Sequence, residues 1–333
     1  MTSDPKRDLQ NQKGDPQKTY VNPSDPNSIP PFVDELPIPE KAEPVCKCNE
    51  SNSEEIMYNI IMCGTKHSFH RDFPLTRVWG YNGTYPGPTI EVQKDIRIKV
   101  KWENKLPLRH LLPVDHTLHG TVDTPDVRTV VHLHGANVEA DSDGHPEAWF
   151  SRDNMFVGQK YTKEVYEYTN HQSGGTLWYH DHAIGVTRLN VYSGLAGFYL
   201  IRDFLERRLN LPEEPYEIPI MIQDKQFNAD GSLFYPDNAT PPVPNPVPST
   251  PSFFFGNTIV VNGKIWPYLE VEPRKYRFRI LNASNVRGYD LSLSNGEVFH
   301  QIGTELGLLH ESVELNSFVI EPCLLYTSPS PRD

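Results

Sequence analysis

Thr176-Leu-Trp-Tyr-His-Asp-His182 is one of two stretches around which the rest of this chain is organised, and Thr129-Val-Val-His-Leu-His-Gly135 is the other. Each stretch is rich in residues that favour β-strands and holds two histidines separated by one residue. Because side chains alternate between the two faces of a strand, the two histidines of each pair share a face. Four imidazoles on two strands predict a metal site. The candidate ligands are His132, His134, His180 and His182.

The alternative to a metal site is ordinary packing, since a single buried histidine is more often a core residue than a ligand. Two His-X-His pairs in strand-like runs, flanked by glycine turns at Gly135 and at residues 174–175, favour ligation over packing. Imidazole nitrogens suit copper, zinc, nickel and iron, so the ligand set alone leaves the metal open.

The composition fits a globular protein with many loops. The 333 residues are enough for two domains, and 37% hydrophobic residues, 22% charged residues and 31 prolines fit a loop-rich β architecture. The formal net charge of −12 argues against nucleic acid or an anionic membrane as a partner. The N-terminal residues lack the apolar core of a secretory signal, and no stretch approaches the ~18–20 apolar residues of a membrane helix.

Short strand signals separated by glycine and proline turns recur along the chain, and helical periodicity is nearly absent. Between residues 96 and 102, apolar side chains alternate with Arg97, Lys99 and Lys101, as in a half-buried strand. This pattern predicts an all-β fold of Greek-key β-sandwiches or barrels. The other expected strands are Val130–His134, Lys163–Tyr168, Thr176–His180, Leu195–Ile201, Glu217–Ile222, Thr258–Val261, Tyr276–Leu281, Leu291–Leu293 and Val298–Ile302.

The two histidine motifs resemble the copper motifs in the first domain of multicopper oxidases. The resemblance rests on His132-Leu-His-Gly135, on Asp143-Gly144 and on Gly175-Thr-Leu-Trp-Tyr-His-Asp-His182. Leu133 and Asp181 make the chain similar to the branch of bacterial spore-coat laccases and bilirubin oxidases. Further motifs that agree, between about residues 32 and 322, are Phe32–Pro39, Trp79–Gly83, Pro86–Ile90, Pro146–Phe150, Thr187–Asn190, Val261–Lys264 and Tyr276–Arg279.

This resemblance implies tandem cupredoxin-like Greek-key β-sandwich domains. We expect a complete first domain at residues 32–205, an incomplete second domain without copper at 206–322, and no third domain. The polar, proline-rich segment 1–31 is expected to be disordered. Residues 323–333 do not continue the family pattern and are interpreted as a non-native, adaptor-like tail. We therefore expect a free sheet edge after Pro322, and a tail that is extended and poorly packed.

The resemblance also implies the chemistry of a laccase or bilirubin oxidase, with O2 and a small phenolic or aromatic reductant as reactants. His132 would ligate the single copper of a trinuclear cluster, and the other three candidate histidines would ligate the coupled copper pair. Asp143 aligns with a carboxylate that would help to deliver protons to bound oxygen, and the alternative is a loop cap before Gly144. The family's blue copper needs a His-Cys-His motif, which these 333 residues lack, so we expect this chain to be inactive alone.

Two other functions are consistent with the residues. A non-catalytic copper- or zinc-binding β-sandwich protein would hold metal through the four histidines without turnover. A mononuclear zinc hydrolase needs a compact ligand set with a general base, and no His-Glu-X-X-His run occurs. We expect a monomer, located in the cytoplasm or in a spore-coat-like layer, with neither a membrane nor nucleic acid as partner.

Overall fold

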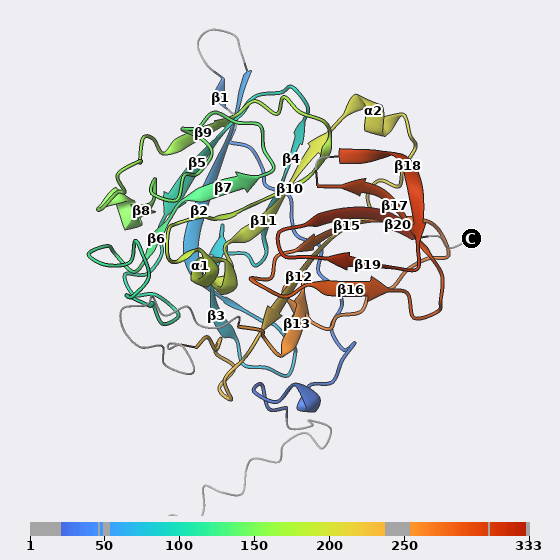
Figure 1. Cartoon of the computed structure of the whole chain (residues 1–333), viewed down its shortest axis with the longest axis horizontal. Coiled ribbons are helices and arrows are strands. Elements are labelled where there is room, and N and C mark those ends of the chain that lie inside the picture. Colours follow the sequence, from blue (N-terminus) through green and yellow to red (C-terminus); the bar gives the residue numbers. More distant parts are fainter. Residues whose placement is uncertain (1–20, 46, 49–53, 237–253, 306, 331–333) are drawn as a thin grey trace, which may run out of the picture.

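The first half of the chain forms two β-sheets that pack against each other, and the second half forms one large sheet and one small one (Figure 1). The computed structural model describes residues 21–45, 47–48, 54–236, 254–305 and 307–330. In that part of the chain the helices are short: η1 (Pro26–Ser28), η2 (Arg152–Asn154), α1 (Thr187–Ser193) and α2 (Phe204–Arg207). The prediction of an all-β fold is confirmed.

The sheets of the first half have the strand orders β1-β2-β5-β9, with β3 also on β2, and β4-β11-β10-β7. Strands β6 and β8 form a separate pair. Most neighbours are antiparallel, but β2 pairs with β5 and β4 pairs with β11 in parallel. The strands are β1 (Lys47–Cys48), β2 (Glu54–His67), β3 (Thr76–Tyr81), β4 (Gly87–Gln93), β5 (Ile98–Asn104), β6 (Arg128–Thr129), β7 (Val131–His134), β8 (Phe150–Ser151), β9 (Val165–Tyr168), β10 (Gly175–Asp181) and β11 (Ala196–Arg202).

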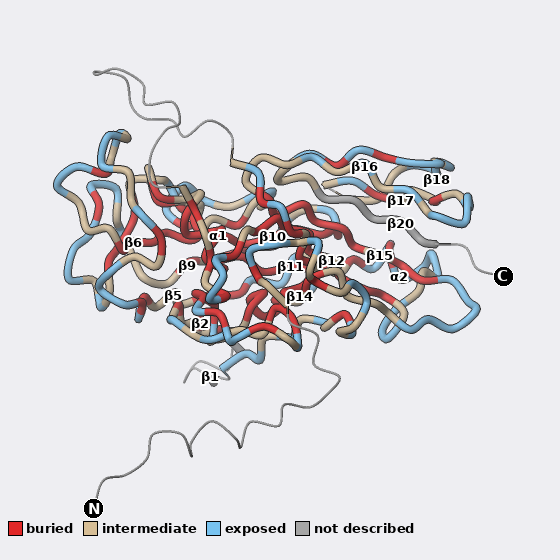
Figure 2. Tube along the Cα trace, turned by 90° about the horizontal axis from the view of Figure 1, so that it is seen from below, coloured by how far each residue is buried: buried red, intermediate tan, exposed pale blue. Residues whose placement is uncertain are grey.

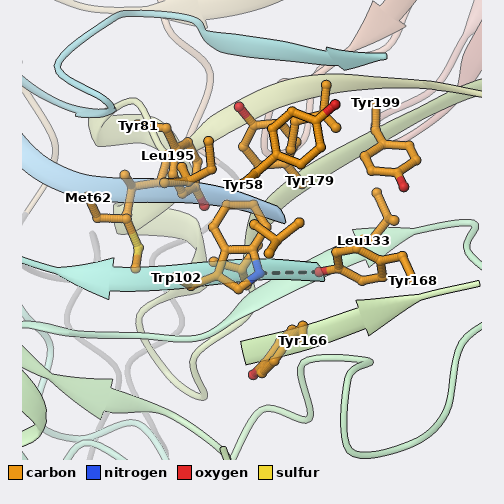
Figure 3. Close-up of a cluster of buried hydrophobic side chains, with 14 of the residues drawn as sticks. Tyr58, Met62, Tyr81, Trp102, Leu133, Tyr166, Tyr168, Tyr179, Leu195 and Tyr199 are labelled. Carbon is orange, nitrogen blue, oxygen red and sulfur yellow. Dashed lines mark hydrogen bonds between the residues drawn. The ribbon is translucent and has the colours of Figure 1, made fainter. Parts of the chain in front are cut away.

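An aromatic core fills the space between these two sheets (Figure 3). The Trp102 ring from β5 lies 5.4 Å from the Tyr179 ring of β10, and its Nε1 donates to the Tyr168 hydroxyl at 3.3 Å. Leu133 of β7 belongs to the same core and is 1% exposed. Each large apolar side chain buried here contributes about 1.5–3 kcal/mol to folding. Because Leu133 and Tyr179 face this core, the histidines beside them in the chain face the opposite side of their sheet.

The second half is built on a seven-stranded sheet of order β14-β13-β12-β15-β20-β17-β18, with β16 and β19 paired separately. Phe299, Phe318 and Ile320 are buried in its core. The strands are β12 (Glu217–Lys225), β13 (Thr258–Val261), β14 (Lys264–Ile265), β15 (Tyr276–Asn282), β16 (Tyr289–Ser292), β17 (Phe299–Thr304), β18 (Gly307–Leu315), β19 (Ser317–Ile320) and β20 (Leu325–Ser330).

Buried residues run without a break from one half into the other, through β10, β11, β12 and β15 (Figure 2). One shared cluster contains Trp178 and Phe198 from the first half with Met221 and Leu281 from the second. The proposed boundary between residues 205 and 206 falls inside α2, which leads from β11 to β12. Helix α2 begins with Asp203, whose side chain accepts from the Leu205 amide as an N-cap.

The N-terminal segment departs in part from the expectation of disorder over residues 1–31. Residues 1–20 lie outside the described part of the chain. Residues 21–31 contain η1, where the Asp25 side chain accepts from the Asn27 amide, and Ile29 is 3% exposed in the core shared by the two halves. The many polar residues and prolines of this segment predicted disorder, although the apolar Ile29 anchors part of it in the core.

The predicted free edge after Pro322 is wrong, because β20 occupies it. Its residues pair with β15 from Tyr276↔Ser330 to Leu281↔Leu325, and Thr327 also pairs with Gly303 of β17. Almost any sequence can form backbone hydrogen bonds with the edge of a sheet. The pairing of β20 therefore does not test the non-native origin of residues 323–333, which stays a prediction. Pro329 supports that origin, because proline has no N–H to donate to a neighbouring strand and is disfavoured inside a sheet.

The helices described here include none that is both long and apolar enough to cross a membrane.

Candidate metal centre

The register of two neighbouring strands brings the predicted histidines together. Strand β7 is at the edge of its sheet beside β10, and His132 pairs directly with His180, while His134 pairs with Trp178 (Figure 1). One nitrogen each of His132, His134 and His180 lies within 4.8 Å of the others. His182 follows β10 and its ring stacks on that of His132, with the centroids 4.8 Å apart. All four imidazoles therefore meet at one place.

Three of the four rings are oriented by backbone carbonyls. The Nδ1 atoms of His132, His180 and His182 lie 2.5, 2.8 and 3.0 Å from the carbonyl oxygens of Asp143, Asp181 and Gly144. A carbonyl only accepts, so each Nδ1 carries the hydrogen and each Nε2 keeps its lone pair. Metal-ligating histidines characteristically donate their second ring nitrogen in this way.

Nε2 of His180 is the clearest sign of a missing partner. His180 is 5% exposed, and its Nε2 is buried without a hydrogen-bond partner. Leaving a buried nitrogen unpaired costs about 1–3 kcal/mol. A metal ion bound to this nitrogen removes that cost, and imidazole is a ligand that copper accepts. The residues present therefore fit a copper ion.

The electrostatic environment favours the neutral form of three candidate ligands. Burial holds the pKa of His180 well below its usual value, and burial also lowers the pKa of His134 and of His182. The neighbouring imidazoles lower these pKa values further, because one charged ring disfavours another. Neutral imidazole is the form that binds metal ions.

The loop at residues 143–144 supplies two of the orienting carbonyls, which the sequence reasoning missed. Gly144 has a φ of +79°, and a Cβ at this position would collide with the Val131 carbonyl. Only glycine lets the loop approach so closely. The Asp143-Gly144 sequence was a visible signal of a tight turn, but it does not show which carbonyl reaches which ring.

Asp143 was predicted for its carboxylate. Its side chain is 50% exposed, and Oδ1 lies 3.4 Å from Nδ1 of His132. The structure thus places the carboxylate between solvent and a candidate ligand. His145, two residues further along the chain, is exposed.

Two further residues shape the site. The Trp178 ring lies against the His180 ring, with centroids 4.0 Å apart, and forms a wall behind it. The buried Asp181 carboxylate accepts from the amides of Val130 and Ala183, each at 3.1 Å, and so joins the two histidine stretches. Burial raises the pKa of Asp181 to about 7. On one side the centre stays open, since His132, His134 and His182 are half-buried.

Comparison with known proteins places the chain in a family. It is 58% identical over 295 residues to a laccase of Bacillus stratosphericus and 54% identical over 301 residues to a laccase of Bacillus subtilis (strain 168). A family model described as multicopper oxidase matches residues 65–121 and 121–205, which include all four histidines. The chain belongs to the multicopper oxidase family. Copper is the metal that this family implies.

The match covers most of this chain but only part of its relatives. It spans 87% and 89% of the chain, and 57% and 58% of the two laccases, so the chain has a little over half their length. The plant multicopper oxidase LPR1 of Arabidopsis thaliana is 41% identical and is covered to 48%. The match therefore establishes the family, and the activity and the substrates of the whole multicopper oxidase are proposals.

Solved structures agree on the fold. The multicopper oxidase of Pediococcus acidilactici superposes with a TM-score of 0.72 at 25% identity, over 91% of this chain and 56% of the other. The multicopper oxidase McoA of Aquifex aeolicus gives 0.68 at 28% identity, over 89% and 57%. The predicted cupredoxin-like fold is confirmed.

Proposed function

We propose that this chain holds half of the trinuclear copper centre of a laccase-like multicopper oxidase. His132 would bind the single copper, and His134, His180 and His182 the coupled pair. The observation that carries the proposal is that nitrogens of His132, His134 and His180 lie within 4.8 Å of one another, with the His182 ring stacked on that of His132. Three of the four rings are oriented to present Nε2, and Nε2 of His180 is buried without a hydrogen-bond partner. The family supports the choice of copper over zinc.

The proposed activity of the whole protein is the one-electron oxidation of small phenolic or similar aromatic donors, coupled to the four-electron reduction of O2 to water. Bound copper would supply the redox chemistry. Burial would keep His134, His180 and His182 neutral. The carbonyls of Asp143, Asp181 and Gly144 would hold three of the four rings in place. The half-exposed Asp143 carboxylate would carry protons between solvent and the centre.

For the 333 residues alone, the second function is metal binding without turnover. The blue copper of an oxidase needs a cysteine thiolate, and no His-Cys-His run occurs in the sequence. Copper held by this chain should therefore give no intense blue absorption.

Copper binding by residues 1–333 tests both statements. We expect Cu2+ to be retained through dialysis and lost in part in His134→Ala and in His180→Ala, with no oxidation of a phenolic donor by any of the three proteins. His145→Ala, at an exposed histidine outside the ligand set, is the control and should bind as the wild type does. Wild-type protein that retains no copper, or that oxidises phenols at laccase-like rates, would contradict the proposal.

We also propose a monomer located in the cytoplasm or in a spore-coat-like layer. The monomer is checked by light scattering after size-exclusion chromatography, where a mass near twice 38.1 kDa would contradict it. The location is checked by fractionation of the source cells.

A further inference from the structure

The segment that carries two candidate ligands is continuous with a short helix. This segment, which we call the ligand segment, comprises residues 175–193, from the start of β10 to the end of α1. His180 lies in β10, and His182 lies between the strand and the helix. The amides of Val186 and Thr187 both donate to the Ala183 carbonyl, at 3.2 and 3.0 Å. The hydrogen-bonded turn that leads into helix α1 therefore begins at Ala183, the residue after His182, so a displacement of the helix displaces the backbone next to that ligand.

At its start, the ligand segment is held by an arginine of the second half. Nη1 of Arg279, on β15, donates to the Thr176 hydroxyl at 2.7 Å. Arg279 is 1% exposed, and its Nη2 forms ion pairs with Glu206 and Glu217 at 2.8 and 2.7 Å. Its Nε also donates to Glu217, at 2.7 Å. A guanidinium held at two of its nitrogens presents the third in a fixed direction.

In its middle, the ligand segment is supported through an indole. Trp178 is 2% exposed, and its ring lies against His180. The same indole belongs to the buried cluster that contains Met221, Leu281 and Ala283 of the second half. The second half thus packs behind the Trp178 ring, which in turn contacts the candidate ligand His180.

At its end, the ligand segment is held by two side chains of the second half. Nζ of Lys225, on β12, donates to the Tyr192 carbonyl at 2.5 Å and lies 4.2 Å from the centroid of the Tyr192 ring. Nδ2 of Asn285 donates to the Arg188 carbonyl at 3.0 Å. Both acceptors are carbonyls of α1, whose C-terminal end favours a nearby positive charge.

Fold stability alone is a poor explanation for Lys225. The side chain is 1% exposed, and no carboxylate among the described residues forms an ion pair with it. The adjacent Asp224 carboxylate is taken by the Gly256 amide and by Arg287. Burial lowers the pKa of Lys225 to about 7 although the Asp224 charge acts in the opposite direction, and burying an amine that has no ion-pair partner opposes folding.

We infer that the second half of the chain positions the metal centre, with Lys225, Asn285 and Arg279 as positioning residues that fix the ligand segment. This inference rests on the proposed function, since it concerns the same copper site. It assigns a task to a β-sandwich that contributes no candidate ligand of its own. The task follows from contacts at the start, the middle and the end of one segment.

Lys225→Met separates this task from ordinary packing. Methionine is similar in length and apolar, so it fills the site and removes the donor to the Tyr192 carbonyl together with the amine over the Tyr192 ring. We expect the melting temperature to stay the same or to rise, because a buried amine is lost. Copper affinity, measured by competition with a chromophoric chelator, should fall about tenfold, at the lower end of the range for residues that orient metal ligands. The EPR spectrum of bound Cu2+ should change.

Asn285→Ala is the second variant, at a half-buried residue whose loss the fold tolerates more easily. Lys275→Met, at an exposed lysine of the second half, is the matched control and should leave affinity and spectrum unchanged. Wild-type protein that binds no Cu2+ overturns the proposed function. Wild-type protein that binds Cu2+, with Asn285→Ala and a folded Lys225→Met equal to it in affinity and spectrum, overturns this inference alone. Should Lys225→Met fail to fold, Asn285→Ala decides.

Discussion

At the scale of single residues, the chemistry depends on which imidazole nitrogen is free. The strand period shows from sequence that each pair of histidines shares a face, and the structure brings the four rings together. The sequence does not show that the carbonyls of the 143–144 loop and of Asp181 accept hydrogen bonds from the Nδ1 atoms. Those contacts depend on the path of a loop between strands. The ligand identities remain our proposal, and the orientation of the rings is what the structure adds.

Gly144→Ala tests the close approach of this loop. A side chain in the left-handed region costs about 1–3 kcal/mol. At this position the new Cβ also collides with the Val131 carbonyl, so we expect a larger loss of unfolding free energy and weaker copper binding. Urea denaturation and chelator competition measure the two effects.

The matched control is Gly296→Ala. Gly296 has the same φ of +79°, but a Cβ there meets nothing within 4 Å. This variant should lose only the cost of the backbone conformation and keep the wild-type copper affinity. Equal losses in both variants would show that the Gly144 loop does not constrain the centre.

At the scale of elements, the sequence predicted the strands well and their partners poorly. Thr258–Val261, a run of β-branched residues, was predicted with the observed bounds. Tyr276–Leu281, where apolar residues alternate with arginines, is one residue short of β15. The parallel pairing of β12 with β15 was not predicted, because register and partner depend on residues far away in the chain. The same holds for β20, which lies between β15 and β17.

Removal of residues 325–333 tests what β20 contributes. The deletion leaves the N–H and C=O groups of β15 unpaired along one edge, and such edges recruit other chains. We expect lower solubility and an increase in light scattering during mild heating. A shorter deletion, of residues 331–333, is the control. Equal scattering from both shortened proteins and the full chain would mean that β20 is not a stable part of the sheet.

At the scale of the whole molecule, the two halves share buried side chains and polar contacts. His67, at the end of β2, is half-buried, and its Nε2 lies 2.6 Å from the Gly263 carbonyl in the second half. Its ring also lies 5.0 Å from that of Tyr85. Burial lowers the pKa of His67 below its ordinary value of 6.5. Composition and motifs predicted two β domains, but not which histidine would lie between them.

The pH dependence of stability follows from the sign of this shift. The unfolded chain binds a proton near pH 6.5 and the folded chain only at lower pH, so the stability from neutral His67 is complete above 6.5 and declines as the pH falls below it. We expect His67→Gln to reduce the slope of unfolding free energy between pH 6.5 and 5 by up to about 1.4 kcal/mol per pH unit. His119→Gln, at an exposed histidine, is the control variant. An unchanged slope in His67→Gln would show that this ring is protonated equally in both states.

The position of copper in the folded chain tests the central claim most directly. Crystals of residues 1–333 grown with Cu2+ and measured on both sides of the copper absorption edge locate the ion by anomalous scattering. We predict anomalous density between the imidazoles of His132, His134, His180 and His182, within bonding distance of Nε2 of His180. Copper bound elsewhere, with those four rings free of anomalous density, would contradict the assignment of the metal centre.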